Sequence, residues 1–76
     1  MDMKYRLSAK MLSTIGRNIN KARKKQKRSQ EEVSLDAGIE TSYYARIERG
    51  EANPSLEIIY TILQALRLKS SEIFPF

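Results

Sequence analysis

The sequence predicts a compact all-α domain of five helices, and three observations lead to this fold class. The chain has 76 residues, enough for one small domain. It contains only three glycines and two prolines, so few residues interrupt a helix. Apolar residues recur at three- and four-residue steps through most of the chain, which is the spacing of one helical face. A domain this small buries little surface, so a second copy or a partner would stabilise it.

The first helix is predicted to begin just after residue 8 or residue 13. Leu12, Ile15 and Ile19 form its apolar face. Ser8 and Ser13 are both suitable N-caps, so the start stays open. Residues 1–7 are predicted to form an N-terminal arm, and residues 8–76 the folded domain. The basic cluster at residues 24–28 lies at the C-terminal end, where the helix dipole favours positive charge.

Two short helices are predicted next, at about residues 30–37 and 41–49. Ser29 and Glu32 form a capping box at the start of the first of them. Gly38 can adopt the left-handed conformation of a sharp turn, and Gly50 marks the end of the second helix. Two helices joined by a tight glycine turn form a helix-turn-helix, which lays its second helix in the major groove of DNA.

A fourth helix is predicted to follow Pro54, with Ser55 as its N-cap. Its apolar stripe consists of Leu56, Ile59, Ile62, Leu63 and Leu66. A short fifth helix is predicted from Ser70 or Ser71 through Ile73. The chain then ends in an apolar segment that contains Phe74 and Phe76.

The charge is divided unevenly along the chain. Residues 1–30 contain ten Lys or Arg residues against one Asp, a net charge of +9, whereas residues 31–76 carry four against eight, a net charge of −4. A strongly basic half suggests an anionic partner, most often nucleic acid. The alternative is a solvated basic helix face that binds nothing.

The composition excludes several classes of function. The chain has no cysteine and no histidine, so it lacks disulfides, the usual zinc ligands and the commonest general base. No catalytic residue, metal site, cofactor or small-molecule ligand is therefore predicted. No apolar run approaches the roughly 18 residues of a membrane span, and no signal-peptide core is visible, so a cytoplasmic protein is expected.

Several short motifs occur in one order. They are Ser29-Gln30-Glu31-Glu32-Val33, Ala37-Gly38-Ile39, Tyr43-Tyr44, Ile47-Glu48-Arg49-Gly50 and Asn53-Pro54-Ser55-Leu56. With this order and spacing, residues 16–74 resemble the lambda-repressor-like helix-turn-helix domains of phage repressors, Cro proteins and the XRE family of bacterial regulators. The small size also resembles the controller proteins of restriction-modification systems. The resemblance implies a compact DNA-binding domain.

The resemblance assigns base reading to one face of the third helix, at Thr41, Ser42, Ala45 and Arg46. Helical spacing independently places these four residues opposite Tyr44, Ile47 and Glu51. A guanidinium can donate two hydrogen bonds to a guanine, so Arg46 is the sharpest candidate. The alternative is a surface arginine that pairs with Glu40 or Asp36.

The resemblance also implies contacts to DNA phosphates from Ser29, Gln30, Tyr43, Arg49 and Asn53. The N-terminus of the second helix suits such a contact, because its free N–H groups and dipole attract anions. Ser29 could instead serve only as a cap, and Tyr43 could belong partly to the core. Tyr44 is expected inside, with its hydroxyl reaching a rim.

A structural ion pair between Arg23 and Glu48 is a further implication of the resemblance. Such a pair would fix the recognition helix on the first helix, and Arg23 would then not contact DNA.

The sequence departs from the family pattern at three places. No glycine ends the first helix in the segment Gln26-Lys27-Arg28, and Arg67 stands where a glycine is usual, so a non-glycine residue must take a strained conformation or the turn must differ. Ser34 replaces a usual alanine, and fits if its hydroxyl bonds to the preceding turn.

The function predicted from these features is that of a homodimeric, sequence-specific DNA-binding transcriptional regulator on a partly palindromic, double-stranded operator. The dimer surface is predicted at Ile73, Phe74 and Phe76, with a C-terminal plug buried in its own domain as the alternative. The basic residues Lys4, Arg6 and Lys10 could lie along phosphates or reach the minor groove.

Two further functions stay open: an antitoxin-type regulator, which would also bind a toxin chain, and a protein-interaction module without DNA binding. The spacing of the acidic residues predicts no convergent catalytic pair, so an enzyme is not expected.

Overall fold

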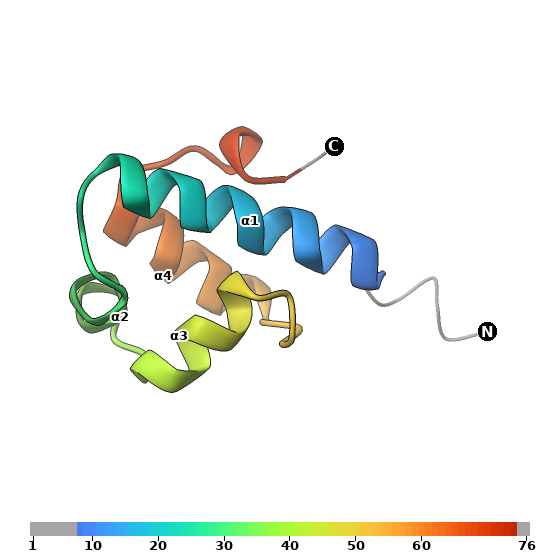
Figure 1. Cartoon of the computed structure of the whole chain (residues 1–76), viewed down its shortest axis with the longest axis horizontal. Helices are drawn as coiled ribbons and strands as arrows, with labels where there is room; N and C mark the ends of the chain where they lie inside the picture. The colour runs from blue at the N-terminus through green and yellow to red at the C-terminus, as the bar shows by residue number, and fades with distance from the viewer. Residues whose placement is uncertain (1–7, 75–76) are drawn as a thin grey trace.

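The structure, a computed structural model, describes residues 8–74 and contains four α-helices in that range. These are α1 (Ala9–Lys25), α2 (Gln30–Ala37), α3 (Thr41–Glu48) and α4 (Leu56–Leu66). In Figure 1, α1 and α4 run one behind the other, and α2 and α3 lie together below them. The predicted arm at residues 1–7, and Phe76, lie outside the described residues.

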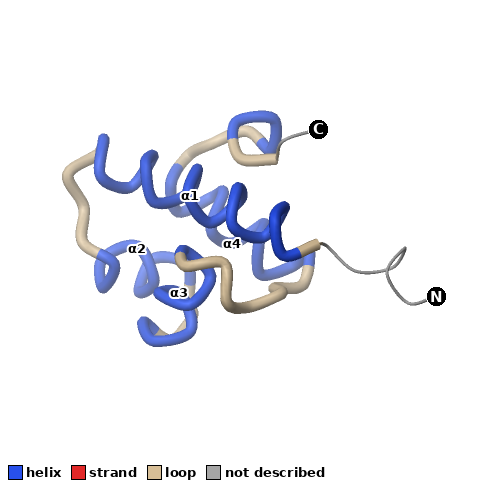
Figure 2. The backbone as a smooth tube through the Cα atoms, turned by 45° about the vertical axis from the view of Figure 1, so that its right-hand side comes forward, coloured by secondary structure: helices blue, strands red, loops and turns tan. Residues whose placement is uncertain are grey.

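The prediction of five helices is wrong in its last element. Ser70–Glu72 (η2) is a single turn of 3-10 helix rather than an α-helix. It is tied to the domain because Asn18 donates from its side-chain amide to the carbonyl of Ile73 at 2.9 Å. Figures 1 and 2 both place this turn on the side of α1 away from α3.

Ile73 follows this turn and is completely buried in the core of its own chain. As placed, its side chain has no surface to offer a second copy, so the prediction of Ile73 in a dimer interface is corrected to the buried plug. Phe74 is half-buried and packs against the same core.

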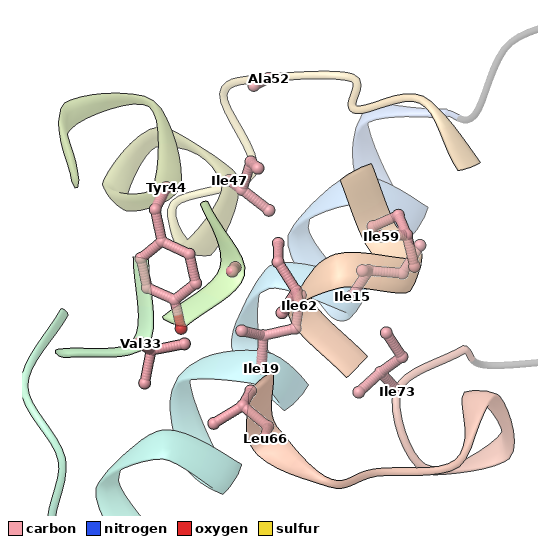
Figure 3. Packing of buried hydrophobic residues seen from close by; sticks show 11 residues of the cluster. Ile15, Ile19, Val33, Tyr44, Ile47, Ala52, Ile59, Ile62, Leu66 and Ile73 are labelled. Carbon is pink, nitrogen blue, oxygen red and sulfur yellow. The ribbon is translucent and has the colours of Figure 1, made fainter. Parts of the chain in front are cut away.

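The core is formed mainly by isoleucines from α1, α3 and α4. Ile15, Ile19 and Ile62 are nearly or completely inaccessible, and Figure 3 shows them stacked between the helices. One member of the predicted α4 stripe differs, because Leu56 is 79% exposed. Leu56 is the first residue of α4, and its position on the helix turns it away from the face that carries Ile59 and Ile62.

Serine caps begin three of the helices. Ser8, Ser29 and Ser55 each accept a hydrogen bond from a backbone N–H three residues ahead. At α2 the capping box is complete, since Glu32 also accepts from the N–H of Ser29. Ser8 rather than Ser13 is therefore the cap of α1.

Two non-glycine residues adopt a left-handed conformation, at the places where the sequence lacks the usual glycine. Lys27 and Arg67 both have φ of 57°. This conformation costs a residue with a Cβ roughly 1–2 kcal/mol, so each turn is strained.

The loop between α1 and α2 fixes the end of α4. Gln26 and Arg28 donate from their side chains to the carbonyls of Leu66 and Ala65, at 2.8 and 2.7 Å. These are among the last carbonyls of α4, which have no partner within the helix. Part of the basic cluster thus stabilises the fold.

Candidate nucleic-acid interface

The turn between α2 and α3 sets the direction of α3. Gly38 has φ of 74°, and the N–H of Ile39 donates to the carbonyl of Ser34 at 3.0 Å. The hydroxyl of Ser34 lies 2.8 Å from that of Thr41 and donates to the carbonyl of Glu31 at 3.1 Å. The hydroxyl thus bonds to the preceding turn, as expected for a serine at this position, and also joins the two helices.

The outer face of α3 is polar. Ser42 and Arg46 are exposed, and Thr41 and Ala45 are half-buried. Tyr44, Ile47 and Glu48 are buried on the opposite face. The four predicted base-reading residues therefore share one accessible face. Glu51 does not continue the buried face as the spacing predicted, because it follows the helix end and is exposed.

Glu48, the last residue of α3, has a buried carboxylate that accepts four hydrogen bonds. Arg23 donates from Nε to Oε2 at 2.7 Å and from Nη2 to Oε1 at 3.1 Å. Asn20 and Gln30 donate from their amides to Oε1, at 2.8 and 2.9 Å. Arg23 also donates to the carbonyl of Arg28 at 2.9 Å. This cluster, Asn20, Arg23, Gln30 and Glu48, joins α1, α2 and α3.

The hydrogen bonds hold Glu48 in its charged form. Burial alone would raise the pKa of this carboxyl, but the donors, chiefly Arg23, outweigh burial and lower the pKa to about 2. The same hydrogen bond raises the pKa of Arg23. The pair is therefore ionised at any physiological pH.

Tyr44 lies beside this cluster. Burial raises the pKa of Tyr44 well above its ordinary value, and the charge of Glu48 raises it further. Its hydroxyl is buried and has no hydrogen-bond partner among the described residues, so the expected position at a rim is wrong. Figure 3 shows the hydroxyl pointing toward Val33, inside the core.

Gly16 allows the end of α3 to approach α1 closely. A Cβ at Gly16 would lie 2.4 Å from the carbonyl oxygen of Ile47 and 2.5 Å from that of Glu48. Only glycine fits at this contact. No sequence pattern predicted this role for Gly16, because a close approach between two helices leaves no local signal in the sequence.

A family described as Helix-turn-helix matches residues 19–73, which are most of the chain and include α2, α3 and α4. The chain belongs to the helix-turn-helix family. Relatives and a solved structure agree with this assignment, and they belong to DNA-binding regulators rather than enzymes.

An HTH-type transcriptional regulator of Sinorhizobium fredii, y4dJ, is 32% identical over 63 residues, which are 83% of this chain and 82% of that protein. The immunity repressor protein of Bacillus phage phi105 is 37% identical over 60 residues, 79% of this chain but 42% of the repressor. The restriction-modification controller protein C.AhdI from Aeromonas hydrophila has 32% identity and a TM-score of 0.80, covering 83% of this chain and 96% of that one.

The residues predicted to contact phosphates are placed differently from one another in this helix-turn-helix domain. Asn53 is exposed on the loop after α3, and Arg49 forms an exposed ion pair with Glu51 at 3.1 Å. Tyr43 is half-buried and packs partly on the core. Ser29 serves as the α2 cap, and the Gln30 amide donates to Glu48. Ser29 and Gln30 thus both have a role within the fold itself.

Arg46 does not form either of the ion pairs suggested as alternatives. Its guanidinium donates only to the carbonyl of Glu51, at 3.3 Å, among the described residues. Asp36 is instead paired with Arg28, at 2.6 Å. Arg46 therefore remains exposed on the outer face of α3.

The described residues contain no helix long and apolar enough to cross a membrane. Within the same range, no group of acidic residues is arranged to hold a metal ion.

Proposed function

We propose that this helix-turn-helix regulator binds a specific, partly palindromic DNA operator as a homodimer and places α3 in the major groove. The observation that carries the proposal is the division of α3 into two faces. One face is anchored through Tyr44, Ile47 and Glu48, and the other presents Arg46 and three small residues to solvent. A recognition helix needs both properties, because it must be held rigidly and still reach base edges.

The roles within α3 follow from chemistry. Arg46 would donate to guanine O6 and N7, Thr41 and Ser42 would bond to bases or phosphates, and the Ala45 methyl would pack on a thymine methyl. Arg49 and Asn53 would contact phosphates beside the groove. Two copies related by a twofold axis would bind half-sites about one helical turn apart. The regulator would act in the cytoplasm, on promoter DNA.

Selection of bound sequences from a random DNA pool tests this function directly. The expected result is an enriched motif with twofold symmetry. Arg46→Ala should relax base preference at one position and cost about 1–3 kcal/mol of binding free energy on the selected operator. Asn53→Ala, at a position that is also exposed, should weaken binding to selected and random DNA alike.

Binding by fluorescence anisotropy, with each variant on both kinds of DNA, separates these outcomes. Equal losses from Arg46→Ala on operator and random DNA would remove Arg46 from the base-reading set. A pool that yields no enriched motif would overturn sequence-specific binding itself.

A further inference from the structure

The outer face of α4 carries apolar side chains that the domain does not bury. Leu56 is 79% exposed and Tyr60 is 58% exposed. With Leu63, Gln64 and Arg67 they recur at three- and four-residue steps, so they share one side of the helix, away from Ile59, Ile62 and Leu66. Single exposed apolar residues are normal on a surface, but Leu56 and Tyr60 share this face with Leu63, which is half-buried against the core. Apolar side chains gathered on one face are typical of a surface that holds a partner.

A hollow of about 640 Å³ lies at the C-terminal end of the same face. It is lined by Tyr60, Leu63, Gln64, Arg67, Leu68 and Ser70. Gln64 donates to the hydroxyl of Tyr60 at 2.8 Å, which holds these two side chains together at its edge. The face therefore has a protruding leucine at one end and a hollow at the other.

These two ends match each other when α4 meets a second α4 in antiparallel orientation. In a twofold pair centred on position 62, residues equally far from that position face each other. Leu56 then faces Leu68 of the second copy, in the lining of the hollow. Tyr60 faces Gln64 of the second copy.

The charges match in the same register. Glu57, in the first turn of α4, faces Arg67 of the second copy, and Arg67 faces Glu57 of the second copy. Neither residue has an ion pair within the described part of its own chain. The register that places Leu56 opposite Leu68, in the lining of the hollow, thus also brings two Glu57–Arg67 pairs together.

We infer that a second copy of this chain docks on the outer face of α4, with Leu56 of each copy in the hollow of the other and with Glu57–Arg67 pairs on both sides. The inference deepens the proposed homodimer and rests on it. It moves the interface from the C-terminal residues, of which Ile73 is committed to the core, to α4.

Charge reversal tests this register by sedimentation equilibrium of the whole chain without DNA. Arg67→Glu and Glu57→Arg each place like charges opposite each other twice per dimer, and each should raise the dimer dissociation constant about tenfold or more. The double variant Glu57→Arg/Arg67→Glu restores opposite charges and should dimerise much as the native chain does. Lys21→Glu, a reversal on the exposed face of α1, is the matched control and should leave the constant unchanged.

Restoration by the double variant distinguishes a broken interface from a damaged fold. The inference is overturned if the native chain is monomeric, if the single reversals dimerise normally, or if the double variant is as weak as they are. Binding to a single half-site, which one copy can occupy, is measured on the same variants. If the variants bind the half-site normally but the double variant does not restore dimerisation, the α4 interface is refuted and the DNA-binding function is left intact. If the native chain itself does not bind the half-site, that function is refuted.

Discussion

Glu48 anchors the end of α3 to α1 and α2. Its carboxylate ends α3 and is held by donors from α1 and α2, and its side chain is only 3% exposed. A buried charge is costly unless every partner is present, so the cluster acts as one unit. The sequence resemblance predicted Arg23 as the partner of Glu48, but Asn20 and Gln30 were not predicted as donors, because amides have no distinctive spacing.

Replacing Glu48 by Gln should destabilise the domain strongly. The change removes the charge that pairs with Arg23 and leaves the guanidinium largely buried, which costs roughly 3–5 kcal/mol. Urea unfolding followed by circular dichroism measures the loss. Glu51→Gln is the matched control: it removes the same charge from the exposed pair with Arg49 and should change the free energy of unfolding little. Similar losses in both variants would contradict the special role of the buried pair.

The same cluster predicts how the free energy of unfolding depends on pH. The pKa of Glu48 is about 2 in the folded chain against 4.5 as an unperturbed group, so the unfolded state binds the proton more readily. Ionised Glu48 therefore contributes about 3 kcal/mol to the free energy of unfolding above about pH 4.5, and this contribution is lost as the pH falls toward 2. The difference in unfolding free energy between native chain and Glu48→Gln should shrink over that range. A difference that stays constant between pH 5 and pH 2.5 would contradict the assignment.

The contact between α1 and α3 depends on the absence of a side chain at Gly16. Inside a helix, Gly→Ala normally stabilises by about 1 kcal/mol. Here a Cβ would meet two backbone carbonyl oxygens of α3, which cannot rotate away, so Gly16→Ala should instead destabilise by about 1–3 kcal/mol. Thermal unfolding shows the sign. Arg17→Ala, the exposed neighbour, should have little effect, and a Gly16→Ala variant more stable than the native chain would disprove the close approach.

The helices themselves were largely predictable, and their contacts were not. Caps and glycines are local signals, so α2, its capping box and the turn at Gly38 appear at the expected residues. Periodicity fixes which residues share a face but not which of two apolar faces is buried, and so Leu56 was assigned to the core. Arg28 was interpreted only as part of a basic cluster, whereas its side chain binds the end of α4. This contact was not predicted because its partner lies far along the chain.

The asymmetric charge of the chain is distributed over surfaces with different roles. Lys10, Arg17, Lys21 and Lys24 recur at helical spacing on one exposed face of α1, opposite the buried Ile15 and Ile19. The side of α1 that packs against α3, at Gly16, is a different one. DNA bound along α3 as proposed would therefore not lie against this exposed face. In the proposed complex the α1 face would therefore add only long-range attraction, and direct phosphate contacts would come from the α3 side.

This division predicts how salt affects binding. Each phosphate contact releases counterions and adds about 0.9 to the slope of log affinity against log salt concentration. Arg49→Gln should therefore lower the slope by roughly 1, while Lys21→Gln, which removes the same charge from α1, should leave the slope nearly unchanged and weaken binding only slightly at low salt. Anisotropy titrations on one operator at several salt concentrations give both slopes. If the two variants lower the slope equally, the α1 face contacts the backbone, and α3 cannot be the only helix that lies against the DNA.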